Sequence, residues 1–172
     1  MSDEKLQYPV GKFSPKESYT PEEINALIAS IEAIPAKIEA TFKKFSPQQL
    51  DTPYRPGGWT ARQVLHHVPD SHMNAYIRFK WTLTENTPTI KAYNEKDWAN
   101  TYETKQDPAL SVALLKALHA KWVTLLRSLT PEDLQKSFVH PETGKNVRLD
   151  RLIAMYAWHG EHHLGHLKII VG

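Results

Sequence analysis

Residues 20–44 read TPEEINALIASIEAIPAKIEATFKK, and this stretch has both the start and the period of an amphipathic helix. Thr20 suits the N-cap position, Pro21 suits the first helical position, and two glutamates follow in the first turn. Pro35 predicts a kink, because proline lacks the amide hydrogen that an interior turn needs. The stretch therefore predicts a helix to about Lys44, with one apolar face made of Ile24, Leu27, Ile28, Ile31, Ile38 and Phe42.

Three further long helices are predicted, over about residues 59–84, 108–129 and 148–170. Four long amphipathic segments are typical of a four-helix bundle, so we expect an all-α fold. A chain of 172 residues can form a single domain, 1–172, in which an extended N-terminal arm (1–20) lies on a helical bundle (21–172). The third helix is expected to bury the face that carries Leu110, Leu114, Leu118, Trp122 and Leu125.

The connections between these helices differ in length and composition. Residues 47–59 form a turn-rich connector with three prolines and two glycines, and residues 140–149 are expected to turn through Thr143-Gly144 like a hairpin. Residues 85–108 are the longest irregular stretch, with a short helix expected at about 96–102. Because long loops in compact domains often border functional sites, we expect this one to do so.

Composition excludes several classes of function. The 21 Lys and Arg residues nearly balance the 19 Asp and Glu residues and form no basic block, which argues against nucleic-acid binding. The first residues, MSDEKLQYPV, are not a signal peptide, and no run of eighteen apolar residues would span a membrane. Cysteine is absent, so any metal ligands are histidines, carboxylates or backbone oxygens. We expect a soluble cytoplasmic protein.

The histidines are concentrated in two stretches. WHGEHHLGH, residues 158–166, holds four of the nine, and on a helix His159 and His163 share a face because they are four residues apart. Two such imidazoles can bind one cation, and a third from a facing helix leaves a position open for water or substrate. Glu161 is two residues after His159 and points away, so we do not predict it as a base.

His66 and His67 are the candidates for the third ligand. They point about 100° apart, so only one of them can face the fourth helix. His67 lies where the apolar face of its helix meets a strip of polar residues, whereas His66 lies on the far side of that strip and is expected to be more exposed. Spacing favours His67 without excluding His66, because Pro69 can distort this helix. The polar strip carries Gln63, Asp70, Asn74 and Arg78.

The segment LDTPYRPGGWTARQVLHHVPDSHMNAYIRFKWTLTENTP (50–88) and the later WHGEHHLGHL (158–167) resemble the YfiT group of the DinB/YfiT-like superfamily. The arm sequence YPVGKF and the TPEE helix start are also similar. The resemblance implies a dimeric four-helix bundle that holds one divalent metal per chain with three histidines. In the family pattern a tryptophan precedes the first ligand by eight residues, so Trp59 identifies His67, which joins His159 and His163.

The resemblance also implies an enzyme. Family members are regarded as metal-dependent hydrolases, and relatives in the superfamily transfer low-molecular-weight thiols such as bacillithiol onto electrophiles. Zinc is the first choice of metal and nickel the second, although iron and cobalt also suit nitrogen ligands. A bound water would give hydrolysis and a bound thiol would give S-transfer. The predicted partners are a small-molecule substrate, a thiol with an electrophile, and a second copy of the chain, with no nucleic acid and no membrane.

Further residues are candidates for supporting roles. Asp70 and His166 could orient an imidazole or act on a bound water from beyond the ligands. Asn74, Arg78 and Tyr156 could contact substrate, with Arg78 suited to a carboxylate. Two other hypotheses remain open at this point. The protein could be a non-catalytic, metal-stabilised stress-response or binding protein, or an interaction module whose histidines are surface residues.

Overall fold

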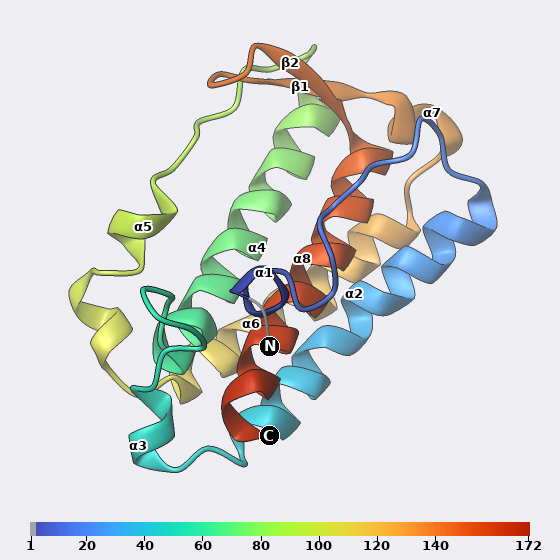
Figure 1. Cartoon of the computed structure of the whole chain (residues 1–172). Helices are drawn as coiled ribbons and strands as arrows, with labels where there is room; N and C mark the ends of the chain where they lie inside the picture. Colours follow the sequence, from blue (N-terminus) through green and yellow to red (C-terminus); the bar gives the residue numbers. More distant parts are fainter. Residues whose placement is uncertain (1–2) are drawn as a thin grey trace.

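The computed structural model describes residues 3–172 and forms a bundle of four long helices (Figure 1). These helices are α2 (Pro21–Phe42), α4 (Ala61–Thr84), α6 (Ala109–Arg127) and α8 (Leu149–Val171). Each one contacts two neighbours, in the ring order α2, α8, α4, α6. The predicted all-α bundle is confirmed, and the four predicted helix spans agree with the observed ones to within about two residues.

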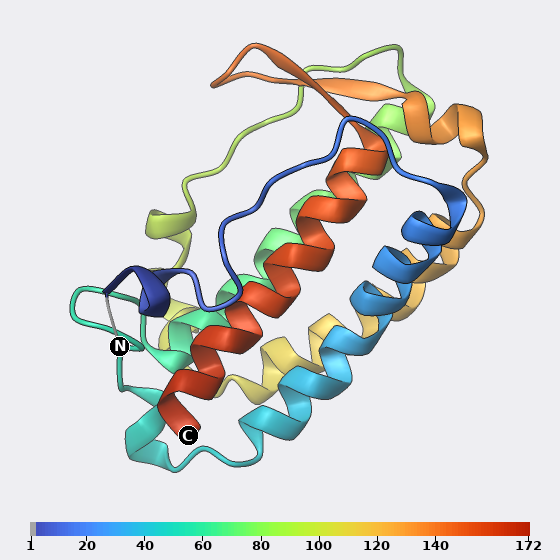
Figure 2. The ribbon, with the colours of Figure 1, turned by 45° about the vertical axis from the view of Figure 1, so that its right-hand side comes forward.

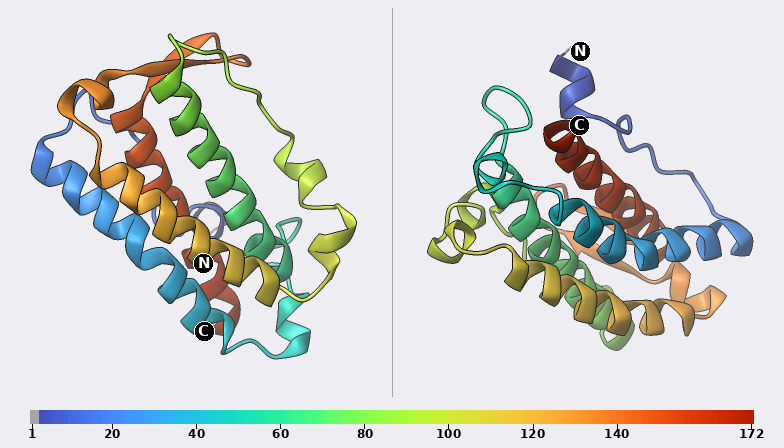
Figure 3. Two further views of the ribbon diagram at one scale, coloured as in Figure 1. Left: turned by 180° about the vertical axis from the view of Figure 1, so that it is seen from behind. Right: turned by 90° about the horizontal axis from the view of Figure 1, so that it is seen from below.

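The helix directions follow from residues in contact. His66 contacts Ser111 and His72 contacts His119, so α4 and α6 run parallel. Ser71 contacts Tyr156, whereas His67, earlier in α4, lies beside His163, later in α8. Helices α4 and α8 therefore run antiparallel. Glu32 pairs with Arg127 and Glu39 with Lys116, so α2 and α6 also run antiparallel (Figure 3, left).

The parallel pair explains the long connection from α4 to α6. A chain that leaves one helix and enters a parallel neighbour must return along the whole bundle, and residues 85–108 do so over the outside of α4 (Figure 1). This connection contains α5 (Glu95–Trp98) and the 3₁₀ helix η1 (Tyr102–Lys105), close to the predicted short helix at 96–102. Its start is tied to the hairpin described next, because Thr89 bridges to Val139.

Short elements complete the structure. The connector 47–59 contains α3 (Pro47–Leu50), a helical turn that the sequence did not predict, and α7 (Pro131–Gln135) follows α6. The predicted hairpin exists: β1 (Ser137–His140) pairs antiparallel with β2 (Lys145–Arg148), with Phe138 opposite Val147. The tight turn is possible because Gly144 adopts a φ of 64°, which glycine tolerates.

The N-terminal arm lies along α8, in the opposite direction (Figure 2). The indole Nε1 of Trp158 donates to the Gly11 carbonyl at 2.9 Å, and Arg148 donates to the Glu17 carbonyl at 2.7 Å. The arm was expected to be extended throughout, but Asp3–Gln7 forms the short helix α1. Residues 1 and 2 of the predicted arm lie outside the described residues.

The two helices that contain an interior proline, α2 and α4, are continuous. Pro35 lies inside α2 and Pro69 inside α4, and the helices extend for several residues on either side. Capping boxes start both helices: Thr20 caps the Glu23 amide, and Thr60 caps the Gln63 amide while the third-position side chains return to the cap backbone. Proline therefore removes one backbone donor within each helix without ending it.

The predicted buried face of α6 was wrong in part: Trp122 is buried as expected, and Leu118 and Leu125 are half-buried. Leu110 is 72 % exposed and Leu114 is 44 % exposed, whereas the buried face consists of Val112, Leu115, His119, Trp122, Val123 and Leu126. The predicted face is rotated by roughly a quarter-turn about the helix axis from the observed one. The prediction followed the leucines, whereas the observed buried face includes a histidine, His119. α6 is also the one helix among residues 3–172 whose length and composition would allow it to cross a membrane, yet its apolar residues Leu115 and Trp122 are buried in the bundle.

The close contact of α2 and α8 depends on a glycine. A Cβ atom added at Gly160 would lie 2.7 Å from Cγ1 of Ile34, a residue with no exposed surface. We predict that Gly160→Ala lowers the free energy of unfolding by about 1–3 kcal/mol, because the core cannot absorb the extra methyl group without strain. Urea unfolding measures this. In an Ile34→Ala background the same substitution should have little effect, and an equal loss in both backgrounds would contradict the steric explanation.

Candidate metal centre

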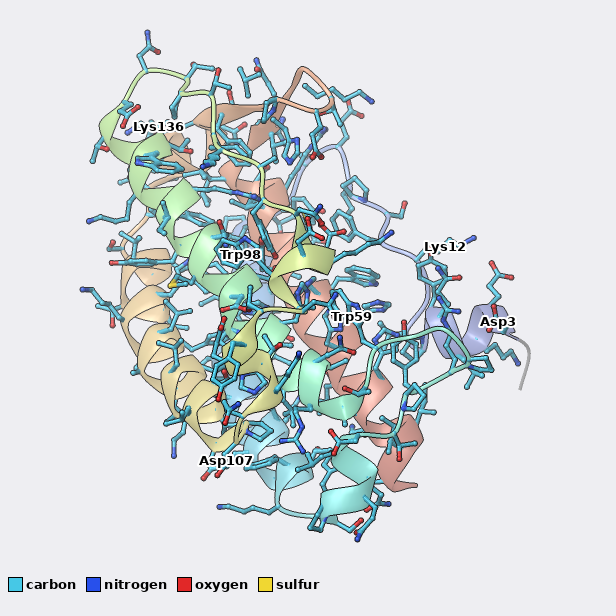
Figure 4. All side chains as sticks on the ribbon, turned by 90° about the vertical axis from the view of Figure 1, so that its left-hand side faces the viewer. Asp3, Lys12, Trp59, Trp98, Asp107 and Lys136 are labelled. Carbon is cyan, nitrogen blue, oxygen red and sulfur yellow. The ribbon has the colours of Figure 1, made fainter. Side chains whose placement is uncertain are left out.

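Three predicted ligands meet at the interface of α4 and α8. His67 of α4 and His159 and His163 of α8 each present a ring nitrogen, and these nitrogens lie within 4.8 Å of one another. The Nε2 atoms of His67 and His159 are 3.3 Å apart. The antiparallel packing of the two helices thus brings together residues 92 positions apart in the chain. Trp59, labelled in Figure 4, packs its ring 4.6 Å from that of His67.

Burial keeps these imidazoles neutral. Burial, followed by charge repulsion from His162 and His166, lowers the pKa of His67 to about 4. Burial also holds the pKa of His159 and of His163 well below the usual value. Within residues 3–172 no carboxylate forms an ion pair with any of the three rings. Neutral imidazoles have the lone pairs that a cation needs, so the site does not have to lose protons to bind one near neutral pH.

The donor set fits a divalent metal ion. Two nitrogens that bind one ion tetrahedrally at about 2.0–2.1 Å lie about 3.3–3.4 Å apart, which is close to the separation of His67 and His159. Three imidazoles without a carboxylate suit zinc and its neighbours rather than magnesium or calcium. Three protein ligands also leave a coordination position free, which is the arrangement of catalytic sites rather than structural ones.

A second histidine group overlaps the first. Ring nitrogens of His162, His163 and His166 also lie within 4.8 Å of one another. The Nε2 of His166, however, is 3.1 Å from the Gln7 carbonyl, which can only accept, so this nitrogen carries the hydrogen. The neutral His166 ring then accepts through Nδ1 from Nδ1 of His163 at 3.3 Å, which leaves His163 Nε2 free. This arrangement favours His166 as a partner that orients His163.

A cavity of about 230 Å³ adjoins the histidines. Helices α4 and α8 form its sides, and the long connection and the hairpin cover it, so residues 85–108 border this cavity as expected. Tyr93 from that connection lines the cavity, and burial raises its pKa to about 12, so its hydroxyl stays protonated. The lining residues are His67, Ser71, Arg78, Ala92, Tyr93, Glu95, His140, Glu142, Met155, Tyr156 and His159.

Two of the predicted substrate contacts lie in this cavity. Arg78 is only 6 % exposed, forms no salt bridge within the described chain, and leaves its Nε without a hydrogen-bond partner. This differs from the exposed position that a polar strip usually gives an arginine. Tyr156 is 3 % exposed, and its hydroxyl is 3.4 Å from the Ser71 hydroxyl. A buried cation without a counter-ion, beside this histidine cluster, is suited to an anionic ligand.

Asp70 and Asn74 do not join the cluster. The Asn74 amide donates to the backbone oxygen of Asp70 at 2.9 Å, and neither residue lines the cavity. Burial, followed by the charge of Glu103, raises the pKa of the Asp70 carboxyl to about 6. Among residues 3–172 Asp70 has no side-chain hydrogen bond to a histidine. The predicted role of Asp70 in orienting an imidazole or a bound water therefore stays a prediction, and so does the predicted contact of Asn74 with substrate.

The expected exposure of His66 was wrong. It is 4 % exposed because α6 packs beside it, with Nδ1 2.7 Å from the Ser111 hydroxyl and Nε2 3.4 Å from the Gln106 carbonyl. His66 still faces away from α8, as the spacing indicated. Glu161 also points away from the cluster and pairs with Lys37, in agreement with the prediction that it is not a base.

The sequence interpretation missed two histidines that contact the site. His72 of α4 has no exposed surface and lies 3.1 Å from Nδ1 of His159, and His119 of α6 lies 2.8 Å from His72. His72 lies five residues after His67 and its partner is on another helix, so no single-helix spacing connects them. The sequence held no local signal for these contacts, because the buried face of α6 that includes His119 is known only from the structure.

Comparisons with known proteins agree with this geometry. The sequence profile of the DinB superfamily matches residues 30–167. YfiT of Bacillus subtilis (strain 168) is 45 % identical over 168 residues, which cover 97 % of this chain and 94 % of YfiT. A protein of Bacillus cereus (strain 03BB102) is 51 % identical over 162 residues, covering 94 % and 93 % of the two chains. Both relatives carry a provisional designation as metal-dependent hydrolases.

A solved structure extends the comparison to the fold. The structure of Bacillus subtilis YfiT, described as a probable metal-dependent hydrolase with an unusual four-helix bundle topology, superposes with a TM-score of 0.94. The superposition covers 96 % of this chain and 95 % of the YfiT chain, and the two sequences are 45 % identical. In this chain the parallel pairing of α4 with α6 departs from a simple up-and-down bundle. By profile, sequence and structure, this chain belongs to the DinB superfamily, within its YfiT group.

Proposed function

We propose that the protein is a metal-dependent hydrolase or thiol S-transferase, with one divalent ion held by His67, His159 and His163. The observation that carries this proposal is the convergence of three buried, neutral imidazoles without a carboxylate, beside a cavity. The designation of the YfiT relatives supports the hydrolase half. Such an ion would act as a Lewis acid that lowers the pKa of a water or thiol bound to it.

The protein's own residues would then hold and shield the reactants. The lining of the cavity by Tyr93 and Tyr156, both protonated at neutral pH, supplies two hydroxyl groups that can donate to a substrate oxygen. The contact between His166 and His163 supports an orienting role for His166 rather than a role as base. Zinc remains our first choice of metal and nickel the second.

Arg78 points to the substrate class. Its burial and lack of a counter-ion support a substrate that carries a carboxylate, which would make charge-assisted hydrogen bonds with the guanidinium. Glu95 and Glu142 also line the cavity, at its exposed rim, and form no ion pair with Arg78 within residues 3–172. We therefore propose small carboxylate-bearing esters or amides for hydrolysis, or a carboxylate-bearing thiol for transfer.

One assay separates the two reactions. The zinc- or nickel-loaded protein is incubated with a panel of carboxylate-bearing esters and amides, and separately with a thiol and an epoxide or activated halide. Hydrolysis releases an acid with an alcohol or amine, whereas S-transfer gives a thioether. Turnover that continues after the metal has been removed would contradict the proposal, and metal binding without either product would favour the non-catalytic alternative. The homodimer and the cytoplasmic location stay predictions, and size-exclusion chromatography with light scattering tests the first.

Removing one ligand should remove the metal. We predict that untagged protein carries about one divalent ion per chain, and that His67→Ala, His159→Ala or His163→Ala each abolish stoichiometric binding, since two imidazoles hold an ion far more weakly than three. Elemental analysis measures this. His66→Ala is the matched control, because His66 is a buried neighbour that faces α6 instead, and it should keep the metal. Equal metal content in His66→Ala and His67→Ala would contradict the assignment.

Stability of the metal-free protein should fall in mild acid. Burial lowers the pKa of His67, His119 and His166 to about 4, below the value of about 6.5 in the unfolded chain. Between pH 6.5 and 4 the unfolded chain therefore binds more protons. Each such histidine should lower the free energy of unfolding by about 1.4 kcal/mol for every pH unit. Urea unfolding at pH 7.5, 6 and 5 measures this, and a constant free energy would show that the rings are not buried in neutral form.

Replacing Arg78 should weaken the binding of acidic substrates selectively. Arg78→Met should raise KM about 10–100-fold for a carboxylate-bearing substrate, which corresponds to about 1.5–3 kcal/mol for a hydrogen bond to a charged group. A neutral analogue of the same substrate should be nearly unaffected. Lys80→Met removes an exposed cation from the same helix and serves as the control. An equal rise in KM for the acidic and neutral substrates would show that Arg78 has only a structural role.

A further inference from the structure

Pro35 leaves a buried backbone carbonyl without its usual donor. In an α-helix the carbonyl of residue 31 accepts from the amide of residue 35, but proline has no amide hydrogen. The Ile31 carbonyl instead lies 2.7 Å from Nδ1 of His119, which reaches across from α6. Because Ile31 has no exposed surface, this histidine supplies the hydrogen bond that water cannot. A carbonyl only accepts, so Nδ1 of His119 carries a hydrogen.

A line of imidazoles runs from His119 to the metal centre. The Nε2 atom of His119 lies 2.8 Å from Nδ1 of His72, and Nε2 of His72 lies 3.1 Å from Nδ1 of His159. His72 has no exposed surface and His119 has 2 %. No carboxylate forms an ion pair with any of these rings within the described part of the chain. Buried rings without a counter-ion are stable only in the neutral form, with one hydrogen each.

The direction of every hydrogen bond in this line follows from its buried end. The single N–H of His119 donates to the Ile31 carbonyl, so the Nε2 of His119 can only accept. His72 must therefore donate to it through Nδ1. The Nε2 of His72 is then also an acceptor, and His159 must donate through Nδ1. The Nε2 of His159 is consequently left with a lone pair, and this is the atom that faces His67.

We propose that the relay Ile31 carbonyl–His119–His72 is a positioning device that fixes His159 in the tautomer whose Nε2 can bind the metal. His72 and His119 are positioning residues in this proposal, since they act through His159 and do not touch the ion or the substrate. The inference rests on the proposed metal centre for its purpose, but the tautomer it assigns is a property of the metal-free protein.

A competing partner explains why the relay matters. The hydroxyl of Ser71 lies 3.4 Å from Nε2 of His159, so an unconstrained ring could place its hydrogen on Nε2 and donate to Ser71. That tautomer would have no lone pair for a cation. The shorter 3.1 Å contact with His72 on the opposite side of the ring favours the binding-competent form. A hydrogen bond to the remote nitrogen of a metal-bound histidine also orients the ring, and its loss typically weakens metal binding about 10–100-fold.

The tautomer can be observed directly. Long-range ¹H–¹⁵N correlation spectra of ¹⁵N-histidine-labelled, metal-free, full-length protein at pH 7.5 distinguish a protonated from an unprotonated ring nitrogen. His119, His72 and His159 should each be protonated at Nδ1 and unprotonated at Nε2. An Nε2-protonated His159 in the wild-type protein would overturn the proposal without any variant. Because no metal is present, this result stands even if the proposed hydrolase or transferase activity is never found.

Two variants of His119 test the polarity of the relay. His119→Leu fills space but neither donates nor accepts, whereas the His119→Gln amide can donate to the Ile31 carbonyl and accept from His72. His119→Leu should give His159 a population protonated at Nε2, and His119→Gln should keep the wild-type tautomer. His66→Leu is the matched control, since it removes a buried histidine outside the relay. An unchanged His159 spectrum in His119→Leu would overturn the proposal.

Zinc affinity gives a second readout. Competition with a chromophoric chelator, using Zn²⁺ alone, should show a dissociation constant raised about 10–100-fold in His119→Leu and within a few-fold of wild type in His119→Gln and His66→Leu. Melting temperatures of the metal-free variants separate this effect from general destabilisation. Equal losses of affinity in the leucine and glutamine variants would show that only the shape of His119 matters and would overturn the proposal.

Discussion

The antiparallel contact between α4 and α8 is the constraint on which the rest of the site depends. It places His67 opposite a pair of histidines one helical turn apart, so three nitrogens from two distant segments converge. The contact is held by packing beside it: a glycine lets α2 approach α8, and Trp59 covers the His67 ring. If α8 rotated or slid by one residue, the pair would leave the interface, because successive residues on a helix point about 100° apart.

The topology adds a cover to that contact. Since α4 and α6 run parallel, the chain must return along the bundle between them, and it passes over the α4 side of the site. That return brings Tyr93 to the cavity, while the arm brings the Gln7 carbonyl to His166. An ordinary up-and-down bundle with short loops would have no such return beside its core. The order of the helices thus gives the histidines a partly enclosed pocket, and the N-terminal arm adds a backbone acceptor.

Sequence predicted the histidine cluster better than its surroundings. Spacing gave the pair His159 and His163, and Trp59 in the family pattern selected His67 from two adjacent candidates. Such signals are local, because a helix fixes which residues four apart share a face. The burial of Arg78 and His66 and the register of α6 depend on which helix packs beside which, and a polar residue in a buried stripe misleads any count of apolar positions. Those features required the tertiary structure.

The same limit explains why the relay behind His159 was not predicted. Pro35 suggested only a kink, since a missing amide hydrogen is normally read as a defect within its own helix. In the bundle, the carbonyl that proline leaves free becomes the fixed acceptor at the end of a line of rings from two other helices. An imidazole can carry its hydrogen on either nitrogen, so a line of imidazoles alone has two equivalent directions. A carbonyl group has one, and this asymmetry is what a proline in α2 contributes to a histidine in α8.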